Sequence, residues 1–370
     1  MFDPQKIKKA EEYLHQCVHE GKIAGCSLLI KDGGKESLYL DSGFSDLKTK
    51  VPFQRDTVCR LFSVTKVFTS VAVFKAMELG LFSKEDPLGK FFPELQSPVV
   101  EIEGKHLHVP SPSIEQTLNM TAGFQYNNGL TASVFTQVLE SGFTLSTSEF
   151  ASRIATLPLL YVPGTKRIYS VSADMLAAII EKTSGMTYGN FLKKYLFEPA
   201  GIPNIGFSIA DGQRKHLSHV YSKTKNGLEE YDQDSLGIRF DGKPNAFESG
   251  GGGLFATIDE VSLFADALLS YKILRKETLE SIFQEKEKDP KPSPSDWMTP
   301  KGTVYKNLVQ IRREYDENCP YSSVDEFGWS GWLGCYLAIN PSTRRSFVFF
   351  TQLVNYGEGE VCKEVRKILY

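Results

Sequence analysis

The run Leu61-Phe62-Ser63-Val64-Thr65-Lys66-Val67-Phe68 restricts the fold and chemistry of this chain more than any other stretch. It opens an apolar pattern of helical period that continues to Phe74 and stops at Gly80. Side chains three residues apart project from one face of a helix, so Ser63 and Lys66 are predicted to lie side by side. A hydroxyl and an amine held together at a helix N-terminus can act as nucleophile and proton acceptor without a histidine.

The spacing Ser-x-x-Lys occurs three times in the chain, and context separates the copies. Ser45 lies in an expected turn region between Gly43 and Pro52, and Ser222 lies in a polar stretch. Only Ser63 opens a long apolar helix. The ordinary interpretation of such a pair is a helix-capping serine and a solvated lysine. The further motifs described below argue against that interpretation for Ser63.

The composition is that of a globular protein with a large core. The chain has 370 residues, 41% hydrophobic and 24% charged, and its net charge of −3 gives no reason to expect nucleic acid or an anionic membrane as a partner. No apolar run is long enough to span a bilayer, and the charged N-terminus lacks a signal-peptide core, so we expect a cytoplasmic location. The six scattered cysteines are typical of reduced thiols. His106 and His108 have the spacing of metal ligands but no third partner nearby, so no metal or cofactor is expected.

The order of patterns predicts a sheet built from both chain ends with helices inserted between. A helix is expected at 4–20 and a hairpin at 25–40, and strand signals then fade from about 86 to 203. A capping box at Thr257 opens another helix, and two late strands are expected at about 329–339 and 346–354. We therefore predict one catalytic unit: residues 1–85 and 204–370 form an α/β (α+β) sheet subdomain, and 86–203 a helical one. The charged, proline-rich stretch at 285–302 is expected to be a solvated loop or a flap at the edge of a pocket.

Two further segments complete a set of three motifs. Tyr169-Ser170-Val171 precedes a helix, and Trp329-Ser330-Gly331-Trp332-Leu333-Gly334 begins a late strand. With Ser63-x-x-Lys66, they resemble the motifs of serine hydrolases with the β-lactamase/penicillin-binding-protein (transpeptidase-like) fold. The chain is most similar to the class C β-lactamases and the family VIII carboxylesterases. Further landmarks spread the resemblance over nearly the whole chain: Leu196–Gly201, Gly250–Thr257 and Thr117–Phe124.

The resemblance implies a role for each matching residue. Ser63 would be the nucleophile that forms an acyl-enzyme, and Lys66 and Tyr169 would share the proton transfer as one coupled unit. Burial and the helix N-terminus are expected to favour the neutral amine of Lys66. The backbone N–H groups of Ser63 and Trp332 would form the oxyanion hole. Residues expected to contact the substrate are Trp329, Ser330, Gly331 and Tyr126.

Two departures from the β-lactamase pattern shift the expected substrate. Val171 stands where an asparagine is usual, and Trp329 stands where a lysine helps to hold a substrate carboxylate. Cations from unassigned loops, such as Arg312, are alternative anchors. The residue types at 171 and 329 resemble those of the esterases and related acyltransferases.

The sequence therefore predicts a serine hydrolase that cleaves small-molecule carboxylic esters or small amides. The alternatives are a D-amino-acid peptidase or amidase, an acyltransferase on the same site and, after these, a β-lactamase. A non-enzyme alternative is a catalytically silent protein that keeps the fold for binding or assembly. The joint presence of Ser63, Lys66 and Tyr169 argues against that last alternative.

Overall fold

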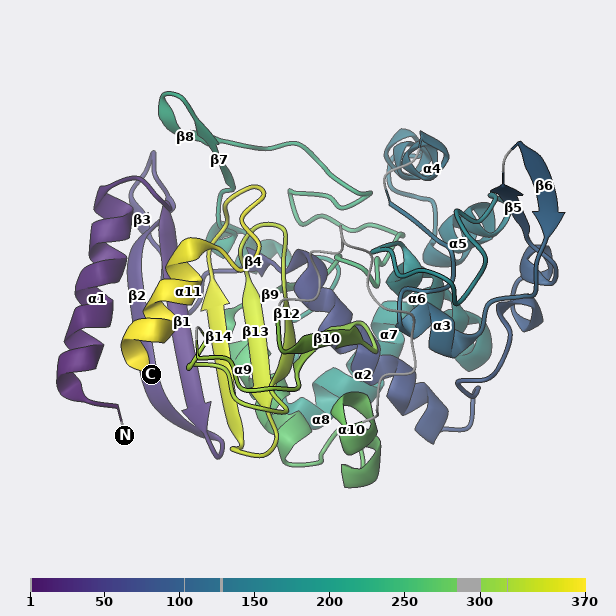
Figure 1. Ribbon diagram of the computed structural model, residues 1–370. Coiled ribbons are helices and arrows are strands. Elements are labelled where there is room, and N and C mark those ends of the chain that lie inside the picture. The colour runs from purple at the N-terminus through teal and green to yellow at the C-terminus, as the bar shows by residue number, and fades with distance from the viewer. Residues whose placement is uncertain (1, 103, 127–128, 285–300, 318) are drawn as a thin grey trace.

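The structure is a computed structural model that describes residues 2–102, 104–126, 129–284, 301–317 and 319–370. An antiparallel sheet fills one half of the molecule, and a group of helices fills the other (Figure 1). The strands of the large sheet are β1 (Gly25–Asp32), β2 (Lys35–Asp46), β3 (Val51–Pro52), β10 (Thr303–Lys306), β11 (Val309–Arg312), β12 (Phe327–Ser330), β13 (Tyr336–Asn340) and β14 (Arg345–Phe350). Three two-stranded pairs accompany it: β4 (Cys59–Arg60) with β9 (Phe255–Ala256), β5 (Val99–Ile102) with β6 (Lys105–His108), and β7 (Tyr221–Thr224) with β8 (Gly227–Glu230).

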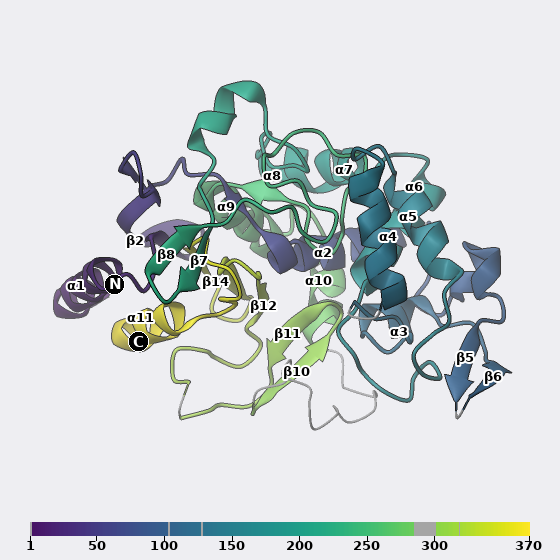
Figure 2. The same cartoon turned by 90° about the horizontal axis from the view of Figure 1, so that it is seen from above.

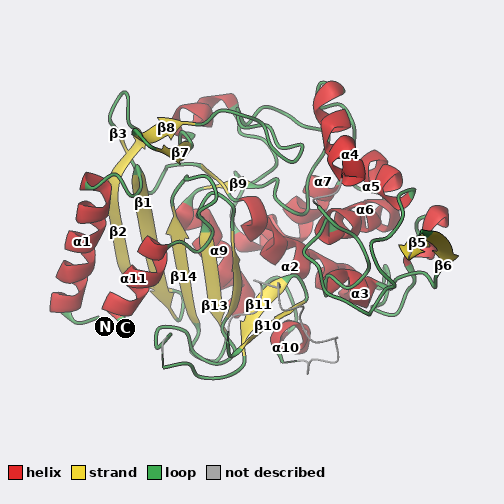
Figure 3. Ribbon diagram, turned by 45° about the horizontal axis from the view of Figure 1, so that its top comes forward, coloured by secondary structure: helices red, strands yellow, loops and turns green. Residues whose placement is uncertain are grey.

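Both ends of the chain contribute to the eight-stranded sheet. Its strand order is β10-β11-β12-β13-β14-β1-β2-β3, so the last strand of the chain pairs with the first. Ser27 of β1 faces Phe350 of β14 in this antiparallel ladder. The two termini consequently lie close together beside the sheet (Figure 3). The predicted antiparallel sheet built from both ends and flanked by helices is confirmed.

Helices cover both faces of the sheet, so the central strands are buried on both sides. The helices are α1 (Pro4–His19), α2 (Thr65–Glu78), α3 (Ile114–Leu118), α4 (Gly129–Glu140), α5 (Thr147–Ala155), α6 (Ser172–Ser184), α7 (Tyr188–Leu192), α8 (Glu198–Ala200), α9 (Ile258–Leu269), α10 (Lys276–Phe283) and α11 (Glu360–Leu369). Leu28 and Ile30 of β1 pack with α1 and α11, and Leu29 between them joins the core on the opposite face. This is the two-residue alternation of a strand.

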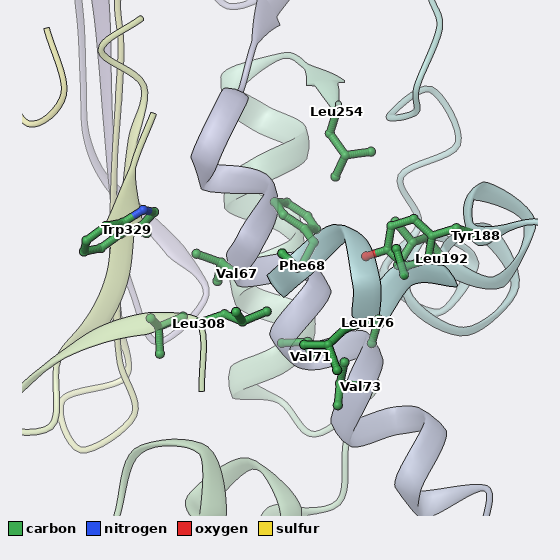
Figure 4. Close-up of a cluster of buried hydrophobic side chains, with 14 of the residues drawn as sticks. Val67, Phe68, Val71, Val73, Leu176, Tyr188, Leu192, Leu254, Leu308 and Trp329 are labelled. Carbon is green, nitrogen blue, oxygen red and sulfur yellow. The ribbon is translucent and has the colours of Figure 1, made fainter. Parts of the chain in front are cut away.

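Helix α2 runs through the middle of the molecule, between the sheet and the group formed by α3 to α7 (Figure 2). Eleven of its 14 residues are buried, because it packs on the sheet at one side and on α6 at the other. Figure 4 shows Val67 on the side of α2 that faces Trp329 of β12, and Tyr188 and Leu192 of α7 approaching from the other direction. The Ser63 segment at the start of α2 is therefore held between the two halves of the molecule.

Several expectations about individual elements are wrong. The single late strand predicted at 329–339 is two antiparallel strands, β12 and β13. Gly331 and Gly334 break it, because Gly334 has a φ of +96° and Gly331 N–H donates to the Cys335 carbonyl at 2.7 Å. Ser45 lies on β2, in place of the expected turn.

The stretch 86–203 also carries strands. It contains the exposed β5–β6 hairpin, which holds His106 and His108, and His108 Nδ1 bonds the Ser97 carbonyl. Its strands do not join the large sheet. The subdomain boundaries after residues 85 and 203 stay predictions.

Two further observations complete the fold. Within the ranges that the structure describes, no helix is both long and apolar enough to cross a bilayer. Residues 285–300, most of the charged, proline-rich stretch, lie outside the described residues.

Candidate active site

A strained backbone places Ser63 at the start of α2. Phe62 has a φ of +45°, a conformation that costs an L-residue on the order of 1–3 kcal/mol. Its ring packs against Trp332 and Phe240, with centroids 5.2 and 5.8 Å away, and Leu61 N–H donates to the Leu254 carbonyl at 2.9 Å. These contacts hold the strained turn, which presents Ser63 to the large cavity of the molecule.

Lys66 is fully buried behind Ser63, and three oxygens surround its side-chain nitrogen. Lys66 Nζ lies 3.2 Å from Ser63 Oγ, 3.2 Å from Tyr126 Oη and 2.6 Å from the Gly251 carbonyl oxygen. One turn further along α2, Thr69 Oγ1 donates to the Gly250 carbonyl at 2.6 Å. Two successive polar side chains of α2 thus bind the glycine run, and the predicted meeting of Ser63 and Lys66 is present in the structure.

The glycine run at 250–253 forms a turn in which Gly253 N–H donates to the Ser249 carbonyl at 2.9 Å. None of the four glycines has a positive φ. A Cβ atom at Gly250 would lie 2.5 Å from the Ala173 carbonyl oxygen, and one at Gly251 would lie 2.7 Å from Tyr126 Oη. These glycines are required because α6 and Tyr126 approach their backbone closely.

Tyr169 reaches Ser63 from the segment before α6. Its hydroxyl lies 2.8 Å from Ser63 Oγ, and its ring centroid lies 4.6 Å from Lys66 Nζ. Trp329 donates its indole N–H to Tyr169 Oη at 3.1 Å and is only 4% exposed. Trp329 therefore contacts Tyr169 directly, a contact that sequence reasoning missed.

The turn between β12 and β13 carries Trp332 to the cavity wall. A Cβ atom at Gly331 would lie 2.2 Å from the Leu61 carbonyl oxygen, so only glycine lets this turn approach the Ser63 segment. The Trp332 indole packs on Phe62 and donates to Asn355 Oδ1. Ser63 and Trp332 both line the cavity, as the proposed oxyanion hole requires, and their N–H groups as its donors stay a prediction.

The cavity has a volume of about 900 Å³, and seven aromatic side chains form part of its wall. The predicted residues that line it are Ser63, Tyr126, Tyr169, Trp329, Ser330, Gly331 and Trp332. Val171 is buried and is not part of the lining. Within the described parts of the chain, no histidine lines the cavity and no group of three metal-binding side chains occurs.

The structure places Arg312, the alternative cation named from the sequence, away from this cavity. Arg312 lines a smaller cavity elsewhere, whereas the exposed Lys166 and the buried Arg167 line this one. Their proximity to Tyr169 in the sequence was the available signal.

Asp174 also lines the cavity and is 1% exposed. Burial raises the pKa of its carboxyl, against the opposing effects of the Ser249 hydrogen bond and the charge of Lys66. Burial likewise raises the pKa of the Tyr126 hydroxyl, and the nearby Asp174 charge adds to that effect.

Comparisons with known proteins agree with this architecture. Residues 10–368 match the model of the family described as Beta-lactamase. Protein Rv1367c of Mycobacterium tuberculosis is 27% identical over 260 residues, which cover 67% of this chain and 63% of that protein. Esterase EstB of Burkholderia gladioli is 25% identical over 281 residues, 71% of this chain and 70% of that protein.

A solved structure gives the same fold over nearly the full length. It is described as EstCE1, a hydrolase with promiscuous acyltransferase activity. It has a TM-score of 0.80 at 22% identity and covers 99% of both chains.

Proposed function

The chain belongs to the beta-lactamase family, and from this premise we propose that it is a serine hydrolase that cleaves carboxylic esters through an acyl-enzyme on Ser63. The observation that carries the proposal is the convergence of Lys66 and Tyr169 on Ser63 Oγ, at 3.2 and 2.8 Å, in the wall of the cavity. The name of the related esterase EstB agrees with this activity.

The proposed reaction has two acyl-transfer steps. Ser63 Oγ loses its proton to the Lys66–Tyr169 unit and bonds to the ester carbonyl carbon. Backbone N–H groups of Ser63 and Trp332 stabilise the oxyanion. The carbon–oxygen bond to the alcohol then breaks, and the alcohol leaves with the proton. Water repeats the sequence on the acyl-enzyme and releases the acid and free Ser63. The proposal assigns every proton transfer in this scheme to Lys66 and Tyr169.

An alcohol in place of water would make the same site an acyltransferase. A cavity of about 900 Å³ has room for a second substrate beside the acyl group. The description of EstCE1 as a hydrolase with acyltransferase activity favours keeping this second candidate. The two activities differ only in the acceptor, so a competing alcohol added to the ester assay distinguishes them by the ester product.

Covalent labelling tests the proposal directly. A fluorophosphonate should add one phosphonyl group to the protein, and digestion should place it on Ser63. Ser63→Ala should abolish the label and lower kcat by roughly 10⁴- to 10⁶-fold, as removal of a nucleophile does. Labelling that persists in Ser63→Ala would refute the assignment. No labelling of the wild type would favour the non-catalytic alternative.

Substrate preference separates the esterase from the β-lactamase alternative. A short-chain aryl ester should show a much higher kcat/KM than a chromogenic cephalosporin, because Trp329 supplies no cation and its N–H is engaged by Tyr169. A β-lactam also needs a protonated leaving nitrogen, whereas an ester has the better leaving group. Efficient cephalosporin hydrolysis with negligible ester turnover would overturn the ester preference and leave the roles of Ser63, Lys66 and Tyr169 standing.

A further inference from the structure

Leu236 is an exposed apolar side chain in the wall of the large cavity. It is 39% exposed, and of the large apolar side chains that are exposed in the described parts of the chain, it is the one that lines this cavity. A single exposed leucine on an ordinary surface needs no explanation. At a ligand cavity it has one, because such cavities bind their ligands mainly through apolar side chains. Leu236 therefore offers apolar area to a bound molecule.

The backbone at Leu236 has a conformation that disfavours leucine. Ser235 N–H donates to the Ile238 carbonyl at 3.3 Å, and Ile238 N–H donates to the Ser235 carbonyl at 2.9 Å. Between them, Leu236 has a φ of +52° and Gly237 a φ of +71°. Tight two-residue turns with two positive φ values prefer asparagine followed by glycine. Gly237 fits this preference, whereas a leucine with a positive φ is strained.

Contacts beneath the turn fix Gly237 in place. Asn245 Nδ2 donates to the Gly237 carbonyl at 2.7 Å. A Cβ atom at Gly237 would lie 2.9 Å from the Phe247 ring and 3.3 Å from Val138 of α4. The chain reaches this position in the segment between β8 and β9, which crosses toward α4 (Figure 1). The surrounding structure therefore imposes the turn, and Leu236 is held in its strained conformation.

The other end of the turn packs beside the nucleophile. Ile238 is 3% exposed and belongs to one apolar cluster with Phe62, the residue before Ser63. A Cβ atom at Gly252 would lie 3.0 Å from Ile238 Cδ1 and 3.6 Å from the Phe62 Cα atom. The turn that carries Leu236 is thus anchored at the wall where the proposed acyl-enzyme forms.

Strained residues persist where the surrounding structure enforces them, and they concentrate at functional sites. We propose that Leu236 determines substrate specificity by contacting an apolar arm of the ester, so that the protein prefers esters with an extended aliphatic or aromatic group. The inference rests on the proposed function and names its substrate class. The cavity of about 900 Å³ is much larger than an acetyl ester and has room for such an arm.

The apolar arm belongs either to the acyl group or to the alcohol, and two ester series distinguish these sources. The first series lengthens the acyl chain of para-nitrophenyl esters from acetate to octanoate. The second lengthens the alcohol of acetate esters from ethyl to octyl. In one series, kcat/KM of the wild type should rise with chain length. Leu236→Ala should lower the ratio of kcat/KM for the longest ester to that for the shortest by about 5- to 20-fold, because it removes apolar contact with the arm.

Two further variants separate substrate contact from other effects. Leu263→Ala is the matched control, because Leu263 is 38% exposed on α9 and does not line the cavity, so the ratio should not change. Leu236→Asn places the preferred residue in the turn, so its Tm should equal or exceed that of the wild type while the ratio falls as in Leu236→Ala. An equal fall in Leu263→Ala would overturn the inference.

Failure of the inference and failure of the proposed function give different results. A rise with chain length in the wild type that both Leu236 variants leave intact would overturn the inference alone. A lower Tm in Leu236→Asn with an unchanged ratio would assign Leu236 a structural role and would overturn it as well. A wild type that hydrolyses no ester of either series and is not labelled at Ser63 would refute the proposed function, and this inference with it.

Discussion

Two buried basic side chains, Lys66 and Arg366, lie in different surroundings. Arg366 on α11 is 1% exposed and forms direct ion pairs with Glu326 at 2.7 Å and Glu358 at 3.4 Å. It also donates to Tyr336 Oη at 2.9 Å. By contrast, the neighbours of Lys66 Nζ are the hydroxyl oxygens of Ser63 and Tyr126 and the carbonyl oxygen of Gly251.

The comparison contrasts a basic side chain held in ion pairs, Arg366, with one held by hydroxyl and carbonyl oxygens, Lys66. Arginine is always charged, and direct pairing fixes it further. Burial lowers the pKa of Arg366, but the charges of Glu326 and Glu358 outweigh this effect and raise the pKa well above its ordinary value. Lys66 lies beside the hydroxyl groups of Ser63 and Tyr126, which can exchange protons with an amine. We call Ser63, Lys66, Tyr169 and Trp329 the chemical cluster, and Arg366, Glu326 and Glu358 the structural cluster. We expect changes in the chemical cluster to lower activity and changes in the structural cluster to lower stability.

The largest effect is expected from the proton-transfer unit. Lys66→Ala and Tyr169→Phe should each lower kcat by about 10²- to 10⁴-fold, because each removes a group that contacts Ser63 Oγ. The double variant should lose much less than the product of the two losses, since the residues act together. Steady-state ester hydrolysis measures all three variants. Fully additive losses in free energy would contradict a shared unit.

Removing the structural cation should affect stability and leave the chemistry alone. Arg366→Ala should lower the free energy of unfolding by about 3–5 kcal/mol, because it leaves two carboxylates without their buried partner. Urea denaturation measures this loss, and the labelling rate per folded molecule should not change. The matched control is Lys367→Ala. That side chain is 47% exposed and pairs with Glu364 at 3.6 Å, so its loss should stay below about 1 kcal/mol.

Loss of the Trp329 indole N–H should lower kcat. Trp329→Phe keeps an aromatic ring and removes the donor to Tyr169 Oη. A hydrogen bond contributes about 0.5–1.5 kcal/mol, so kcat should fall about 2- to 10-fold. Trp332→Phe removes an indole N–H that bonds Asn355, and its loss should be smaller. Equal losses in the two variants would assign Trp329 a packing role only.

The smallest effect is a pH-dependent change at the structural cluster. Burial raises the pKa of Glu358 above its ordinary value, although the charges of Arg366 and Lys363 oppose this. A carboxyl whose pKa is raised on folding favours the folded state below its unfolded pKa, and this contribution is lost as pH rises through the folded pKa. Glu358→Gln should therefore be relatively more stable at neutral pH than at acid pH, compared with the wild type. Thermal unfolding at both pH values measures this, and the opposite trend would contradict it.

Local patterns predicted the parts of this site that depend on local structure. The pairing of Ser63 with Lys66 follows from helical spacing, and the roles of Tyr169 and Trp332 came from resemblance. The contact of Trp329 with Tyr169 and that of Asp174 with Gly251 were not predictable from spacing. These contacts depend on how segments far apart in the sequence pack together, and local sequence patterns do not predict that packing.

The division of the late strand into β12 and β13 was missed for a related reason. Trp329 to Gly334 contains the apolar and aromatic residues of a strand, which favoured one continuous element. The positive φ of Gly334 and the close approach of Gly331 to Leu61 decide the break. Glycine permits both strand and turn, so its conformation is fixed only by the tertiary contacts.

The pairing of β14 with β1 has a consequence for synthesis on the ribosome. Ser27 cannot meet Phe350 until nearly the whole chain has left the exit tunnel, so the sheet closes late. Contacts between residues so far apart in sequence slow folding, because a very long loop must close first. The nascent β1–β2 hairpin meanwhile exposes the edge of β1 that later pairs with β14, and an unpaired edge invites association with other chains. A chaperone that binds this nascent hairpin would therefore raise the yield of folded protein more than one that acts on the completed chain.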